Sequence, residues 1–97
     1  MDIHPDDVAA AIALASSMAE ETRKERGCLL YAFGQDLAQI NRFWLAEEWQ
    51  NEEALAEHFK TLHMMTFRAG LETLRLAHFS ASSYGVTSAT VLIHAGG

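Results

Sequence analysis

The chain has 97 residues, of which 49% are hydrophobic, and its formal net charge is −6. This length suits one domain over residues 1–97, and the apolar content is high enough to favour an oligomer that buries surface. The seven lysines and arginines are scattered, so we expect no nucleic-acid partner. No apolar run approaches the roughly 20 residues of a membrane span, so we expect no membrane association. A single cysteine, Cys28, cannot form an internal disulfide, and no signal-peptide pattern is present, so the expected location is cytoplasmic.

The first part of the chain predicts a long helix. Pro5 suits the first helical position, and Asp6 and Asp7 then face the positive end of the helix dipole. Basic residues in the range 23–26 lie in the last turn, and Gly27 ends it. Between these ends, mostly small residues recur at helical spacing, a pattern typical of close packing on a sheet: Val8, Ala11, Ile12, Ala15, Met18, Ala19 and Thr22.

Two apolar strands are predicted next, at residues 28–34 and 42–49, with a hairpin connection at residues 35–41. Both faces of each strand carry apolar side chains. Because two helices cover only one face of a sheet, the other face predicts a homodimer in which sheet packs on sheet.

A second helical region follows, with Asn51 as its N-cap. A bend near Thr61 divides its apolar stripe, although one continuous helix is the alternative. The residues of this stripe are Leu55, His58, Phe59, Leu62, Met64, Phe67, Leu71 and Leu74. Residues 80–83 predict a loop, and residues 86–94 predict a β-branched final strand.

The predicted order is helix, strand, strand, helix, strand, which fits an α+β ferredoxin-like domain without most of its first strand. Residues 1–4 alone precede Pro5. Either the start codon assigned to the chain lies downstream of the natural one, or the first strand is reduced to its last few residues. We therefore expect an unpaired edge beside the strand at residues 42–49, or a sheet completed by a partner.

The segment from Phe43 to Met64 has the pattern F-x-x-x-E-x-W-x-[NS]-x-x-A-L-x-x-H-x-x-[ST]-x-H-M, and residues 25–31 before it read E-R-G-C-L-L-Y. Over residues 6–76 the chain resembles the antibiotic biosynthesis monooxygenase family, which includes small quinol monooxygenases. The resemblance implies a dimeric α/β barrel built from an antiparallel sheet with helices on one face. It also implies oxygenation of a small aromatic substrate, quinol-like or anthrone-like, by dioxygen without a metal or organic cofactor.

His58 lies on the predicted buried face of its helix, where an imidazole needs a hydrogen-bonding partner, and Glu47 is the nearest predicted one. The pair either holds helix to sheet or makes His58 a base whose pKa the carboxylate tunes. His63 follows five residues later, about 140° round a straight helix, which is poor spacing for two ligands of one metal. No metal site is therefore expected. A bend near Thr61 would turn His63 into the pocket of His58, and the resemblance implies that one of these histidines is the base or a proton relay.

Several aromatic residues either pack in the core or form a flat apolar slot for a substrate ring. Met64 is core filler or an adaptable wall residue. Arg68 is a solvated helix residue or an anchor for a phenolate oxygen. We expect a cavity between sheet and helices, lined by Tyr31, Trp49, His58, Phe59 and Phe67, with Phe43 as a further aromatic contact.

Three other readings stay open within this fold. Haem-degrading enzymes usually carry a tryptophan at the position of His58 and the haem-ligating histidine at that of Arg68, which speaks against haem. Isomerases of a phosphorylated signalling sugar would favour a cationic pocket, for which Arg68 is the one candidate. The third reading is a small-ligand-binding dimer without turnover. No P-loop or G-x-G-x-x-G motif is present, so nucleotide, flavin and nicotinamide binding are not expected.

Overall fold

The computed structural model describes residues 1–78, 80–85 and 89–94, and beyond residue 75 it describes the backbone alone. The elements in chain order are β1 (Asp2–Ile3), the 3-10 turn η1 (Pro5–Asp7), α1 (Val8–Thr22), β2 (Cys28–Gln35), β3 (Phe43–Trp49), α2 (Glu52–His58), α3 (Leu62–Glu72), β4 (Leu76–His78), β5 (Ser80–Gly85) and β6 (Ala89–His94). Among the described helices, none is long and apolar enough to cross a membrane.

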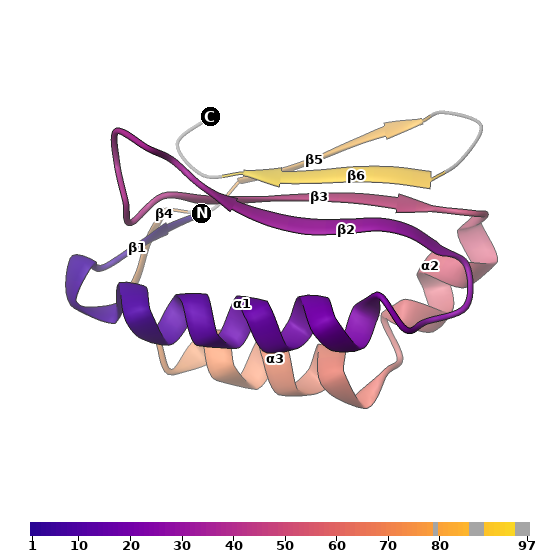
Figure 1. The fold of residues 1–97 in the computed structure, drawn as a ribbon, viewed down its shortest axis with the longest axis horizontal. Helices are drawn as coiled ribbons and strands as arrows, with labels where there is room; N and C mark the ends of the chain where they lie inside the picture. The colour runs from indigo at the N-terminus through magenta and orange to yellow at the C-terminus, as the bar shows by residue number, and fades with distance from the viewer. Residues whose placement is uncertain (79, 86–88, 95–97) are drawn as a thin grey trace.

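The fold has two layers, an antiparallel sheet and a pair of helices on one face of it (Figure 1). The main sheet has four strands in the order β2-β3-β6-β5, and α1 and α3 lie side by side beneath it. Alternate residues of β3 point toward the helices and are buried, among them Phe43, Leu45 and Trp49. The predicted α+β ferredoxin-like architecture with helices on one face is confirmed.

The first strand is short, as predicted, but the sheet beside it is not left open. β1 contains two residues and pairs with β4, while Met1 and Phe43 exchange two backbone hydrogen bonds at the start of β3. From Trp44 to Trp49, β3 pairs with β6 in an antiparallel ladder. The expected unpaired edge beside residues 42–49 is therefore wrong, because β6 occupies the position that a longer first strand would take.

The C-terminal elements differ in part from the expectation. Residues 80–83, expected as a loop, belong to β5, because they pair with β6 in a regular antiparallel register. The predicted final strand is confirmed over residues 89–94, and residues 86–88 lie outside the described part of the chain. The three-residue strand β4 was not predicted.

Helix α1 packs through small residues, and this determines how closely the two helices approach. Ala11, Ala15 and Ala19 are buried against the sheet layer, as the stripe predicts. On the facing helix, a Cβ atom at Gly70 would lie 2.6 Å from the Cδ1 atom of Leu14, so α3 approaches α1 at a point where no side chain fits. α3 is thereby held directly under β2 and β3.

Two local features set the ends of the helices around the later site. Gly27 has a φ angle of +88°, the left-handed region that favours glycine, and it turns the chain from the loop after α1 into β2. Thr61 separates α2 from α3, and its hydroxyl accepts a hydrogen bond from the Met64 amide at 3.2 Å as an N-cap. The predicted bend near Thr61 is confirmed, and the continuous helix is wrong.

The face of the sheet away from the helices is apolar and partly open in the single chain. Leu30 is 45% exposed and Trp44 is 41% exposed, and both belong to the alternate residues of β2 and β3 that point away from the helices. The Trp44 ring lies over Gly34 and leaves no room for a Cβ atom there. Since tryptophan contributes a large apolar area to interfaces, this face stays our prediction for a homodimer contact.

Replacing Trp44 with glutamate is expected to shift a homodimer to a monomer, because a carboxylate in an apolar contact would have to be desolvated without a partner. Light scattering coupled to size-exclusion chromatography at micromolar concentration measures the change. Leu37→Glu is the matched control, because Leu37 is 100% exposed in the β2–β3 connection and lies outside the sheet face. A monodisperse monomer of the unchanged protein would contradict the homodimer.

Asp7 ties η1 to the segment before β4 through Arg75, whose backbone amide and guanidinium donate hydrogen bonds of 3.0–3.1 Å to its carboxylate. Those hydrogen bonds lower the pKa of Asp7 from 3.8 to about 2. A lowered pKa in the folded state means that the carboxylate stabilises the fold above pH 3.8 and that this contribution is lost as the pH falls toward 2.

The melting temperature of Asp7→Asn is therefore expected to lie below that of the unchanged protein near neutral pH. The two should converge as the pH approaches 2, in a series of thermal melts at fixed ionic strength. Arg75→Gln should show a smaller difference, because its backbone amide still reaches Asp7. A gap that persists unchanged at pH 2 would show that the Asp7 charge is not its cause.

Candidate functional site

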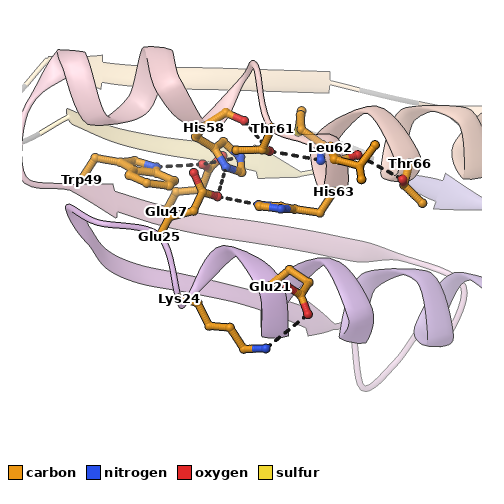
Figure 2. Close-up of polar contacts among 11 residues, drawn as sticks. Glu21, Lys24, Glu25, Glu47, Trp49, His58, Thr61, Leu62, His63 and Thr66 are labelled. Carbon is orange, nitrogen blue, oxygen red and sulfur yellow. Dashed lines mark hydrogen bonds and ion pairs between the residues drawn. The ribbon is translucent and has the colours of Figure 1, made fainter.

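Two parts of the chain that are distant in sequence, the loop after α1 and the region where α2 meets α3, bring a carboxylate and two imidazoles together (Figure 2). Glu25 comes from the loop after α1, His58 is the last residue of α2, and His63 is the second residue of α3. The Oε2 atom of Glu25 lies 2.7 Å from Nδ1 of His58 and 2.7 Å from Nε2 of His63. We call Glu25, His58 and His63 the carboxylate–imidazole cluster.

The bend at Thr61 places His63 in this cluster. On one straight helix the two imidazoles would point in different directions, but the chain leaves the helical path between α2 and α3. The Thr61 hydroxyl donates to the backbone oxygen of His58 at 2.8 Å and caps α3. The two imidazole rings consequently lie 6.0 Å apart, so the predicted entry of His63 into the pocket of His58 is confirmed.

The partner of His58 differs from the expected one. Glu25 makes the short contact with Nδ1, whereas Oε1 of Glu47 lies 3.9 Å from Nε2, which is too long for a hydrogen bond. Glu47 instead accepts a hydrogen bond of 3.0 Å from the Trp49 indole. The expectation of Glu47 as the direct partner was wrong because strand β3 holds its carboxylate against Trp49, two residues away on the same face.

The sequence pattern around Glu25 did not indicate a site residue. Glu25 lies at a helix end among charged residues, where a glutamate normally faces solvent. The left-handed turn at Gly27 brings the loop back under α2, so that the Glu25 side chain is only 13% exposed. Its one signal in the sequence was its place in the E-R-G-C-L-L-Y run.

Burial controls the charge states of the site. The side chain of His58 is 1% exposed, and this burial lowers its pKa, while the hydrogen bond to Glu25 acts in the opposite direction. Burial raises the pKa of Glu47, with the Trp49 hydrogen bond opposing and the charge of Glu25 reinforcing the shift. Burial and the charge of Glu47 raise the pKa of Tyr31, which therefore stays protonated.

Aromatic rings enclose His58 on three sides. Its ring centroid lies 4.7 Å from that of Trp49, 5.5 Å from that of Tyr31 and 5.6 Å from that of Phe59. Trp49 is 0% exposed and Tyr31 is 2% exposed, so these rings fix the orientation of the imidazole. Phe59 covers the outer side and is 41% exposed.

A cavity of about 190 Å³ lies between the sheet and α3, and its wall is almost wholly apolar. Four of the residues expected to contact an aromatic substrate line this cavity, namely Phe43, Met64, Phe67 and Arg68. Its full lining consists of Met1, Phe33, Phe43, Trp44, Leu45, Met64, Phe67, Arg68 and Leu71. Of the five residues expected to line one cavity, Phe67 alone does so, whereas His58 belongs to the cluster, and Tyr31, Trp49 and Phe59 surround His58. The difference arises because these four lie nearer the α2 end of the sheet, where the cluster fills the space.

The cavity and the cluster are neighbours, separated by aromatic rings. Phe33 lines the cavity, and its ring lies 5.6 Å from that of Tyr31, which in turn contacts His58. A surface groove of about 380 Å³ between α1 and α3 has both His63 and Phe67 in its wall. His63, whose side chain is 21% exposed, is therefore the most exposed member of the cluster.

Removing the bridging carboxylate is expected to destabilise the protein. Glu25→Ala leaves the buried Nδ1 of His58 without its acceptor, which costs about 1–3 kcal/mol of unfolding free energy. Urea denaturation followed by circular dichroism measures this. Glu21→Ala is the matched control, because its exposed ion pair with Lys24 contributes about 0–1 kcal/mol. Equal effects of the two substitutions would contradict a structural role for the cluster.

A family model and several solved structures are similar to this chain. The family model described as antibiotic biosynthesis monooxygenase matches residues 1–70. Among solved structures, PA3566 from Pseudomonas aeruginosa is 30% identical with a TM-score of 0.71, over 76% of this chain and 75% of that chain. A candidate antibiotic biosynthesis monooxygenase from Deinococcus radiodurans is 27% identical with a TM-score of 0.81, over 88% of this chain and 84% of that chain.

A curated relative points the same way. An uncharacterized protein of Synechocystis, sll1783, is 37% identical over 65 residues, which cover 67% of this chain. The match spans 44% of the length of that relative. Since the family model covers more than half of the chain, the protein belongs to the antibiotic biosynthesis monooxygenase family.

Proposed function

We propose that the protein oxygenates a small electron-rich aromatic molecule, of the quinol or anthrone type, with dioxygen and without a cofactor. The observation that carries this proposal is the apolar cavity under the sheet, next to a buried carboxylate–imidazole cluster, in a chain of this family. The cavity binds the ring, and the substrate's acidic group extends past Phe67, which lines both the cavity and the groove of His63, so that the cluster accepts the proton whose removal makes the ring a reductant.

The chemistry needs no redox group from the protein. Deprotonation gives a resonance-stabilised anion, which donates an electron to dioxygen, and the resulting radicals combine. For an anthrone-type CH₂ group, one oxygen atom becomes the carbonyl oxygen and the other leaves as water with the two hydrogens of that carbon. The substrate and dioxygen thus supply all atoms and electrons of the reaction.

The cavity contributes a dry environment and a cationic side chain. Apolar side chains such as Leu45, Met64 and Phe67 exclude water, which would otherwise solvate the anion and slow its oxidation. Arg68 lines the same cavity, with its guanidinium carbon 6.0 Å from the Phe59 ring centroid. Within the described residues Arg68 has no carboxylate partner, so its charge is free to stabilise an anionic oxygen.

The cluster contributes the proton acceptor. His63 reaches the groove between α1 and α3, and Glu25 holds its ring and that of His58 in fixed orientations. The hydrogen bond to Glu25 acts to raise the pKa of His58 and so opposes the effect of burial, which favours the proton-accepting role of the cluster. Tyr31 and Trp49 act as walls that hold His58.

Oxygen consumption by the purified protein, measured with a panel of quinols and anthrones in the presence of a chelator, tests this function. His58→Ala and His63→Ala are expected to lower kcat by about 10²–10⁴-fold, the usual contribution of general base catalysis. Arg68→Met should raise KM for the more acidic substrates. Lys60→Ala is the control, because Lys60 lies between His58 and His63 in the chain but its side chain is 71% exposed and pairs with Glu57.

Full activity in a folded His58→Ala protein would eliminate His58 as the base and leave His63. Full activity in both histidine variants, with unchanged circular dichroism, would contradict the role of the cluster. Saturable substrate binding without oxygen consumption by the unchanged protein would instead favour a small-ligand-binding protein.

A further inference from the structure

We propose that Glu25, His58 and His63 also form a binding site for one divalent transition-metal ion of the Zn²⁺ type. This inference goes beyond the proposed oxygenation, which uses the same cluster in its metal-free form. It starts from the identity of the donors, because two imidazoles and one carboxylate are a recurrent ligand set for zinc and for other first-row metals.

The donor atoms converge on one point from three separate segments. One ligand atom from each residue lies within 4.8 Å of the others. Donors bound to one zinc in a tetrahedron lie about 3.4 Å apart, given bond lengths near 2.1 Å. The two contacts of Glu25 are 2.7 Å, so the carboxylate has to move outward by roughly 0.7 Å to admit an ion.

The charge balance of the site favours a cation. Glu25 and Glu47 are 13% and 3% exposed, and no ion pair with a lysine or arginine is found for Glu25 or Glu47 in the described part of the chain. A buried carboxylate needs a compensating positive charge close by. A divalent ion bound between Glu25 and the two imidazoles supplies that charge.

Glu47 occupies the outer position that metal-bound histidines usually require. His58 presents Nδ1 to the centre of the cluster, while its Nε2 faces Oε1 of Glu47 at 3.9 Å. A carboxylate on the far nitrogen orients a metal-bound imidazole and raises its basicity. The Trp49 indole holds Glu47 next to this nitrogen, and the carboxylate has to approach His58 from 3.9 Å before it can accept a hydrogen bond from it.

The site has an entry path and room for a further ligand. His63 is partly exposed and lies in the wall of the groove between α1 and α3. On the other side, Glu25 lines a surface groove next to Gly27 and Thr61. Three protein donors leave one tetrahedral position for water, an arrangement typical of accessible rather than closed sites.

Metal and substrate proton compete for the same nitrogen atoms. An imidazole that binds a metal through its lone pair cannot accept a proton there, so Zn²⁺ is expected to inhibit any oxygenation by the cluster. The test of binding below does not depend on activity. A protein that binds zinc but oxidises no aromatic substrate would support this inference and contradict only the proposed function.

Isothermal titration of untagged, chelator-treated protein with ZnCl₂ is the first measurement. One saturable zinc per chain is expected, together with a rise in melting temperature, because the ion binds the folded state. Glu47→Gln should weaken zinc affinity by about 10–100-fold, as for other residues that orient a ligand. Glu25→Gln and His63→Ala should weaken it at least as much. MgCl₂ should give no binding, because Mg²⁺ prefers oxygen ligands.

His4→Ala is the matched control, because His4 is an accessible histidine outside the cluster, with a side chain 42% exposed. It should bind zinc as the unchanged protein does. The visible absorption of Co²⁺ bound to the unchanged protein reports nitrogen and oxygen ligation without any substitution, so misfolding of a variant does not obscure the result. No saturable zinc in the unchanged protein, or equal affinity in Glu25→Gln, His63→Ala and His4→Ala, would overturn the site.

Discussion

The structure depends on one buried carboxylate that serves two imidazoles. Glu25 links the loop after α1 to both helices of the second helical region, through contacts of 2.7 Å to His58 and His63. Without this link, the end of α1 and the junction between α2 and α3 would meet mainly through apolar contacts, which are not directional. The two contacts of Glu25 tie the loop after α1 to the end of α2 and to the start of α3.

The rings of Phe33 and Tyr31 divide the space under the sheet into two parts with different chemistry. On the α2 side, polar groups are paired with one another inside a ring of aromatic residues. On the other side, the cavity under β3 is apolar apart from Arg68. The titratable groups of the cluster thus lie next to the apolar cavity but outside it. The buried charges are therefore confined to one small hydrogen-bonded network.

The sequence contained most of the fold and about half of the site. Periodicity located α1, β2, β3 and the helices around Thr61, because each of these elements buries one face and so repeats its apolar residues regularly. The short first strand was also foreseen, from the few residues before Pro5. The pairing of β6 with β3 was not, since this strand order depends on contacts between residues 40 to 50 positions apart, which no local pattern encodes. Glu25 was missed for a related reason, because its burial results from the turn at Gly27 and the approach of α2 rather than from its neighbours in sequence.

The ladder along β3 has a consequence for how the chain folds. Its first residue pairs with Met1, and the residue after it pairs with His94, so the two ends of the described chain lie end to end along one strand. This strand therefore cannot complete its hydrogen bonds until both Met1 and β6, which are far from it in sequence, have arrived. Contacts of such long sequence separation carry a large loop-closure entropy and slow folding. The helices and the β2–β3 hairpin close short loops, so we expect them to form early. Met1 and β6 then dock last, and aggregation competes most strongly while β3 is still an open edge.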